Sequence, residues 1–220
     1  RSRSQLGQDL WVLEQTGYQR GGFFVEFGAA DGIYLSNTWL LEAYFGLQGI
    51  CEEPNPELFA VLQHNRCCLI SDACVAGESN REVEFVLADV FGTVTDYVGS
   101  DHHAERRAGY RQANGTIKLK TISLNDFLLE CGAPREIDYL SIDTEGSEYE
   151  ILKGFDFDSW RVRLMTVEHN FTEQRGLIRG LLEERGFCCV EREWDDWYFL
   201  RKDGGNEMGE DLAVSGVEKE

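Results

Sequence analysis

Acidic side chains and one histidine come directly after several apolar runs of this sequence, and such groups can move protons or hold a polar ligand. Asp143 closes one of these runs, and Glu168 and His169 close another. Because the unperturbed pKa of histidine lies near neutrality, His169 is the best candidate for a general base, with Asp143 second and Glu168 beside them. A structural histidine, hydrogen-bonded at the end of a strand, is the alternative for His169.

Five titratable groups follow these two runs: Asp143, Glu145, Glu148, Glu168 and His169. Glu145 and Glu148 could instead be acids at the start of a helix, where the helix dipole favours them. Carboxylates with one histidine could also bind a divalent metal ion. Their spacing along the chain matches no metal-binding motif, so we expect no metal here.

A turn with two glycines follows the first apolar run. Gly28 and Gly32 lie on either side of Ala29 and Asp31, so the backbone can turn sharply and approach a ligand closely. The turn lacks the third glycine of a dinucleotide-binding loop and the lysine of a phosphate-binding loop. Glu26 and Asp31 would repel a pyrophosphate and suit a ligand with an ammonium or sulfonium group. An ordinary glycine turn is the alternative.

The next apolar run, 49–52, leads into a second polar loop that begins with Glu53, Pro54 and Asn55. Glu53 lies 21 residues after Gly32, and an acid at about this distance can accept hydrogen bonds from both ribose hydroxyls of a nucleoside cofactor. A solvated loop residue or a helix cap is the alternative for a lone acid.

Asp72 and Ala73 follow the third run, where an adenine edge would lie if the first two assignments hold. The Asp72 carboxylate could then accept a hydrogen bond from the adenine amino group.

Strand-like and helix-like segments alternate along the chain and must position these residues. Apolar, β-prone runs predict strands at 23–27, 49–52, 67–75, 83–87, 117–121, 137–143 and 163–168, and a closing hairpin at 187–192 and 197–201. Helical spacing predicts helices at 36–45, 56–65, 147–153 and 172–185, with a short one from 123. This alternation predicts an α/β fold with a parallel sheet, helices on both faces and one antiparallel strand at the edge. Ligands bind such sheets beyond the carboxyl ends of the strands, where the candidate residues lie.

The composition limits the partners of the protein. The chain has 220 residues, and 21 basic against 40 acidic residues give a formal net charge of −19. Binding to nucleic acid or to anionic lipid needs a basic patch, and the sequence has none of any size. No apolar stretch is long enough to span a membrane. Seven cysteines, an odd number without a CxxC pattern, indicate reduced thiols and a cytoplasmic protein.

One domain accounts for most of the chain. Residues 1–202 are predicted to form it, and 203–220 an acidic flexible tail. The stretch 96–116 is predicted to be a mobile flap that closes over a substrate, with a disordered insertion as the alternative. The sequence does not begin with methionine, which is typical of a piece of a longer chain. The sequence also leaves open whether the protein forms a homo-oligomer.

Four motifs make the sequence recognisable: FVEFGAADG at 24–32, LSNT at 35–38, GICEEPNP at 49–56 and IDYLSIDTEGSEYEIL at 137–152. They resemble the FkbM family of S-adenosylmethionine-dependent methyltransferases, and 4–9 is similar to the segment that precedes the family's first strand. The resemblance implies a Rossmann-like class I methyltransferase fold with seven strands, the last antiparallel. It also implies S-adenosylmethionine as methyl donor and an oxygen nucleophile, often a sugar hydroxyl, as acceptor.

The resemblance implies roles by position. Gly28, Ala29 and Gly32 would line the methionine part of the cofactor. Glu53 would hold the ribose, and Asp72 with Ala73 the adenine. Ser36, Asn37 and Thr38 would lie at a helix start near the cofactor or the acceptor. The residues predicted to bind the cofactor are Glu26, Gly28, Ala29, Asp31, Gly32, Ser36, Asn37, Thr38, Glu53, Pro54, Asn55, Asp72, Ala73 and Asp143. Ala30 stands where the family often has asparagine, which removes one polar contact.

The sequence thus predicts an S-adenosylmethionine-dependent O-methyltransferase for a sugar or another small-molecule or glycan acceptor. Methyl transfer is an in-line displacement, for which His169 would take the hydroxyl proton. Two alternatives stay open. One is a nicotinamide-dependent oxidoreductase, against which the missing third glycine and the acidic turn count. The other is a non-catalytic binding domain that retains the fold.

Overall fold

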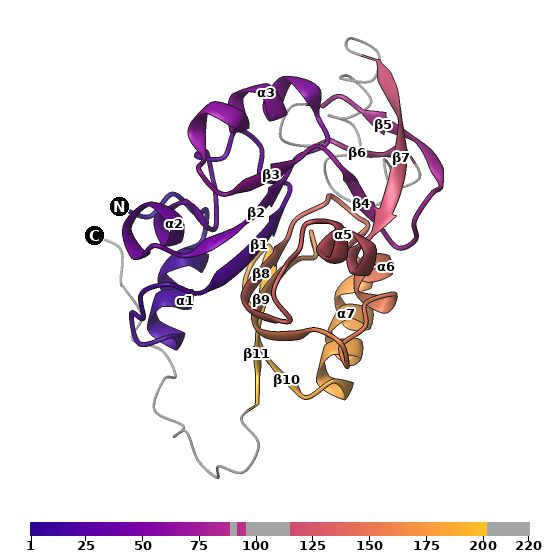
Figure 1. The fold of residues 1–220 in the computed structure, drawn as a ribbon. Helices are drawn as coiled ribbons and strands as arrows, with labels where there is room; N and C mark the ends of the chain where they lie inside the picture. Colours follow the sequence, from indigo (N-terminus) through magenta and orange to yellow (C-terminus); the bar gives the residue numbers. More distant parts are fainter. Residues whose placement is uncertain (89–91, 96–114, 202–220) are drawn as a thin grey trace, which may run out of the picture.

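A twisted seven-stranded sheet runs through the computed structural model, which describes residues 1–88, 92–95 and 115–201 (Figure 1). The order of its strands is β10-β11-β9-β8-β1-β2-β3, and every neighbouring pair is parallel except the two that involve β11. The strands are β1 (Phe23–Phe27), β2 (Gln48–Glu52), β3 (Leu69–Ser71), β8 (Glu136–Ile142), β9 (Arg161–Glu168), β10 (Phe187–Val190) and β11 (Asp195–Leu200).

Helices cover both faces of this sheet (Figure 1). They are α1 (Gln8–Gln15), α2 (Trp39–Phe45), α3 (Pro56–Asn65), α5 (Leu124–Glu130), α6 (Glu148–Lys153) and α7 (Gln174–Glu184). Side chains alternate between the faces of a strand, so β1 feeds two cores. Phe24 packs with residues of α1, α2 and α3 on one face. Val25 and Phe27 pack with residues of α5, α6 and α7 on the other.

A second, smaller sheet lies beside the carboxyl end of the main one. Its strands, in the order β4-β7-β5-β6, are β4 (Cys74–Ala76), β7 (Thr116–Ser123), β5 (Glu82–Val86) and β6 (Thr93–Val94). The sequence predicts a single strand at 67–75, but Asp72 and Ala73 interrupt it and divide it into two short strands. β3 therefore stays in the main sheet, while β4 joins the small one.

The predicted α/β class and its seven-stranded, mostly parallel sheet are confirmed. The predicted place of the antiparallel strand is wrong, because β10 is the edge strand and β11 lies between β10 and β9. After α7 the chain forms the edge strand β10, and it then turns back so that β11 lies between β10 and β9. Helix α1 is not predicted from the sequence, although Trp11, Val12 and Leu13 are buried on it.

Two sequence predictions fall outside the described residues. Only the last two residues of the predicted flap at 96–116 are described, and the predicted tail at 203–220 is not described at all. Among the residues that are described, no helix is both long enough and apolar enough to cross a membrane.

Candidate functional site

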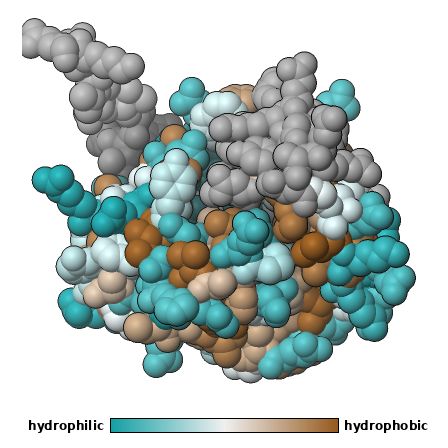
Figure 2. Space-filling model, turned by 90° about the horizontal axis from the view of Figure 1, so that it is seen from above, coloured by the Kyte–Doolittle hydropathy of each residue, from teal (hydrophilic) through white to brown (hydrophobic). Residues whose placement is uncertain are grey.

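A cavity of about 600 Å³ lies at the carboxyl ends of β1, β2, β8 and β9. Its wall combines the glycine turn after β1, the acidic ends of the other strands and side chains of the small sheet. Seen from above, the molecular surface carries apolar side chains (brown) scattered among polar ones (teal) (Figure 2). Strand pairing explains the place of the cavity, because parallel strands end at the same edge.

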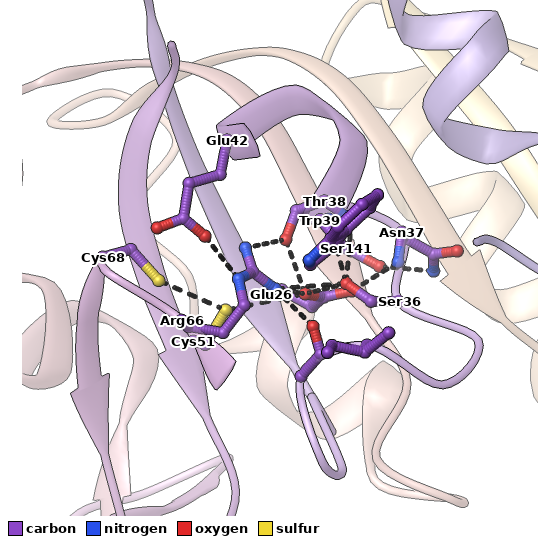
Figure 3. Close-up of polar contacts among 12 residues, drawn as sticks. Glu26, Ser36, Asn37, Thr38, Trp39, Glu42, Cys51, Arg66, Cys68 and Ser141 are labelled. Atoms are coloured by element: carbon purple, nitrogen blue, oxygen red, sulfur yellow. Dashed lines mark hydrogen bonds and ion pairs between the residues drawn. The ribbon is translucent and has the colours of Figure 1, made fainter. Parts of the chain in front are cut away.

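Glu26 is the polar centre at the end of β1 (Figure 3). Its Oε1 accepts the Asn37 backbone N–H at 2.6 Å, and its Oε2 accepts the Thr38 hydroxyl at 2.6 Å and the Ser36 hydroxyl at 3.0 Å. Arg66 Nη1 lies 3.3 Å from the same Oε2. Through these contacts, the buried carboxylate links the end of β1 to the segment that leads into α2.

Arg66, the residue after α3, completes this network and is not predicted as a site residue. Its Nε pairs with Glu42, its Nη2 donates to Thr38 Oγ1 at 2.9 Å and its Nη1 donates to the Gly32 carbonyl at 3.2 Å. The guanidinium also lies over the Phe24 ring, 5.4 Å from its centroid. No local pattern in the sequence marks Arg66, because all these partners are distant along the chain.

The glycine turn is held by close contact between strands. Gly28 has a φ of +70°, and a Cβ there would lie 2.0 Å from the Asp143 carbonyl oxygen. Only glycine fits, so the ends of β1 and β8 touch directly. The Ala30 N–H donates to Glu53 Oε2 at 2.9 Å, which joins the turn to the end of β2.

Glu53 and Glu52 are buried carboxyl groups on the cavity wall. Glu53 also accepts the Asn55 N–H at 2.8 Å. Burial raises the pKa of Glu53 to about 7, although these two hydrogen bonds act in the opposite direction. Burial, followed by the charge of Glu53, raises the pKa of Glu52 well above its usual value. The end of β2 therefore presents carboxyl groups that a donor or a positive charge would stabilise.

Asp143 and Glu168 lie across the cavity from this pair, at the ends of β8 and β9. Burial raises the pKa of Asp143 to about 7 and that of Glu168 well above its usual value. Glu148 is engaged differently, since its carboxylate accepts the N–H groups of Thr144 and Gly146 before α6. It does not line the cavity, which matches the alternative of a helix N-terminal acid.

His169 follows Glu168 but does not line the cavity. Successive side chains at the end of a strand point to opposite faces of the sheet, so the side chains of Glu168 and His169 lie on different faces. The imidazole is buried, its Nδ1 accepts the Phe171 N–H at 3.1 Å, and its Nε2 lies 3.7 Å from Asp196 Oδ1. Burial lowers the pKa of His169, which favours the neutral ring.

Most of the predicted site residues meet at the cavity. Those that line it are Glu26, Gly28, Ala29, Asp31, Ser36, Asn37, Glu53, Pro54, Asp143 and Glu168. Those that do not are Gly32, Thr38, Asn55, Asp72, Ala73 and His169. Thr38 supports Glu26, Asn55 caps α3, and Asp72 is exposed.

The cavity wall also holds residues that are not among the predicted site residues. They include Gln5 and Gln8 near the N-terminus, Tyr34 and Leu35 before α2, and Trp194 before β11. A bridge between Ser4 and Leu35 brings the N-terminal segment to this wall. The similarity of 4–9 to a family segment is the one available signal for the two glutamines.

A seven-stranded sheet of this order, with a ligand-sized cavity at its carboxyl edge, defines a Rossmann-like methyltransferase fold. The crystal structure of Methyltransferase FkbM from Methylobacillus flagellatus KT has the same fold, with a TM-score of 0.52 and 15% identity over 84% of this chain and 46% of that one. The model of the Methyltransferase FkbM domain matches residues 26–189. The chain belongs to the FkbM methyltransferase family, as the motifs predict.

Two curated relatives are similar in sequence. Methyltransferase 1 of Beauveria bassiana (strain ARSEF 2860) is 23% identical over 192 residues, which cover 80% of this chain and 75% of that protein. Methyltransferase sdnD of Sordaria araneosa is 33% identical over 107 residues, which cover 45% and 40%. The match thus spans less than half of the second relative and of the solved structure.

The Arg66 network gives a stability prediction. Replacing Arg66 by methionine leaves the Glu26 carboxylate buried without its cation, which should lower the free energy of unfolding by about 3–5 kcal/mol. Urea denaturation followed by circular dichroism measures this. Arg179→Met removes exposed ion pairs with Glu183 and Glu191 and is the control, expected to cost about 0–1 kcal/mol. Equal losses in the two variants would contradict the role given to Arg66.

Proposed function

We propose that this chain is an S-adenosylmethionine-dependent O-methyltransferase that acts on a hydroxyl group of a sugar or another small-molecule or glycan acceptor. The cavity at the carboxyl edge of the sheet carries the proposal, because its acidic wall suits a ligand with a positive sulfonium and hydroxyl donors. Membership of the FkbM family supports the cofactor. The proposed class of acceptor is supported by the family resemblance and by the volume of the cavity, about 600 Å³.

The cofactor would lie across the ends of β1 and β2. Gly28, Ala29 and Asp31 are the proposed contacts of its methionine part, and the Glu53 carboxylate accepts hydrogen bonds from the ribose hydroxyls. Both Glu53 oxygens already accept backbone N–H groups, which fix the carboxylate in place. A preset acceptor of this kind loses little entropy when the ligand binds.

The methyl group would pass to the acceptor at the ends of β8 and β9. In this step the acceptor oxygen forms a bond to the methyl carbon while the bond from that carbon to sulfur breaks, and the sulfonium becomes a neutral thioether. The hydroxyl must lose its proton. Asp143 and Glu168 line the cavity, and we assign them the task of favouring that loss. His169 does not line the cavity, and its role as a base stays a prediction.

Binding decides between the proposal and its alternatives. We expect S-adenosylhomocysteine, the product of the cofactor, to bind with measurable heat in isothermal titration calorimetry and to raise the melting temperature. NAD serves as the control and should do neither. Binding of NAD alone would favour the oxidoreductase, and binding of neither compound would favour a non-catalytic domain.

The raised pKa of Glu53 predicts a pH dependence of cofactor binding. Hydroxyl groups donate more strongly to a charged carboxylate, and Glu53 gains its charge as the pH rises through about 7. We expect the affinity for S-adenosylhomocysteine to rise up to about tenfold between about pH 6 and about pH 8 and then to level off. Calorimetry on Glu53→Gln should show weaker binding without this rise. The same rise in Glu53→Gln would assign it to another group, such as Glu52 or Asp143.

A pair of variants tests the catalytic assignment. We expect Glu168→Gln to lower turnover by about 100-fold or more, and His169→Ala to lower it less, because only Glu168 lines the cavity. Release of S-adenosylhomocysteine in the presence of a panel of glycosides measures turnover, and calorimetry checks cofactor binding. If His169→Ala loses more activity while binding persists, the histidine is the base after all.

A further inference from the structure

Three carboxyl groups converge at one end of the cavity, although they come from two strands. Asp143 and Glu145 follow β8, and Glu168 ends β9. One oxygen of each lies within 4.8 Å of an oxygen of both others. β8 and β9 are parallel neighbours with Ile142 opposite Val167, so the strand pairing itself brings these groups together.

Like charges of this kind repel one another unless something positive lies between them. The Asp143 and Glu168 side chains lie at hydrogen-bond distance from each other. Two carboxyl groups this close must share either a proton or a cation.

Buried oxygens without a donor lie next to this cluster. Glu168 Oε2, Asn37 Oδ1 and Asp195 Oδ1 accept no hydrogen bond from any described residue. Asn37 is 9% exposed and Asp195 is 6% exposed, and both line a small cavity of about 20 Å³ together with Asp143 and Glu168. A space of this size holds one water molecule or one ion. Its oxygen-rich wall calls for an occupant that donates hydrogen bonds or carries positive charge.

Glu145 accepts a hydrogen bond from Asn170 Nδ2 at 3.3 Å. The small cavity beside Asp143 and Glu168 has no lysine, arginine or histidine among its described lining residues. Arg66 lies behind the main cavity, paired with Glu26 and Glu42. The donor set of the cluster is carboxylate oxygen throughout, which Mg²⁺ and Mn²⁺ prefer over sulfur or nitrogen.

We propose that Asp143, Glu145 and Glu168 bind one divalent cation of the oxygen-preferring class, Mg²⁺ or Mn²⁺, and that this cation holds the acceptor hydroxyl; the second part rests on the proposed function. A hydroxyl bound to a divalent cation loses its proton more readily. The O–H bond breaks and the proton passes to water, the oxygen bonds to the methyl carbon, and the electron pair of the broken S–C bond stays on sulfur. The oxidation state of the cation does not change.

The cation would give the acceptor oxygen a fixed place, which an in-line displacement requires. The proposal departs from the expectation of no metal, which rests on spacing along the chain. Spacing does not reveal this cluster, because the pairing of β8 with β9 assembles it.

Mn²⁺ binding to the full chain tests the proposal, after the protein has been treated with a chelator and freed of it. We expect one Mn²⁺ per chain in isothermal titration calorimetry and in the electron paramagnetic resonance signal of free Mn²⁺. Glu168→Gln and Glu145→Gln should each weaken binding at least tenfold. Asp158→Asn removes an exposed carboxylate outside both cavities and should leave Mn²⁺ binding unchanged. Circular dichroism confirms that each variant is folded.

Titration of the same samples with S-adenosylhomocysteine, with chelator present, separates the two proposals. A wild-type chain that binds S-adenosylhomocysteine but no Mn²⁺ at millimolar concentration would overturn the cation site and leave the proposed function standing. Mn²⁺ affinity unchanged in both glutamine variants would also overturn it, because the ion would then lie elsewhere. Mn²⁺ binding that the variants lose, without binding of S-adenosylhomocysteine, would support the site and contradict the proposed function.

Discussion

The buried ion pair between Arg66 and Glu26 is the contact on which the shape of the cavity depends. Glu26 lies near the end of the central strand β1, where a carboxylate without partners would be strongly unfavourable. Arg66 supplies the countercharge from the end of α3, and three donors before α2 complete the set. The carboxylate of Glu26 thus joins β1 to the end of α3 and to the start of α2. The glycine turn lies in the chain between β1 and α2, so these contacts fix both of its ends.

The acids at the end of β2 are stabilised in another way. Glu52 and Glu53 have backbone N–H groups as their partners: those of Gly28 and Val75 for Glu52, and those of Ala30 and Asn55 for Glu53. Burial raises the pKa of both carboxyl groups, and these backbone N–H donors offset that rise only in part. Burial thus disfavours the charged form of two carboxyl groups on the cavity wall. Binding sites commonly contain such groups, which lower the stability of the fold but serve its function.

Local patterns in the sequence predict much of this structure, because they depend on neighbouring residues. The apolar runs of β1 and β8 and the glycine turn are local features, and the structure has them in the expected places. The order of strands is not local, which is why the position of β11 inside the sheet is missed. Arg66 is missed for the same reason, since its partners come from three other segments.

The candidate site shows the same division. The sequence places Glu168 and His169 correctly at the end of one strand, but it does not tell which of the two side chains enters the cavity. Trp194 lies on the cavity wall because β11 pairs with β9, and no sequence motif predicts this pairing. Residues that follow a strand directly are therefore predictable, whereas residues brought in by strand pairing or by a distant loop are not.

The contact of Gly28 with the Asp143 carbonyl oxygen has a consequence for how this cavity can change in evolution. Because β1 and β8 touch there with no room for a single methyl group, the two strand ends form one rigid unit. Under the proposed function, room for a different acceptor would come from cavity residues outside these strand ends: the glutamines near the N-terminus, Tyr34, Leu35 and Trp194. We expect substitutions there to change which acceptor fits, while the strand ends and the proposed cofactor contacts stay in place.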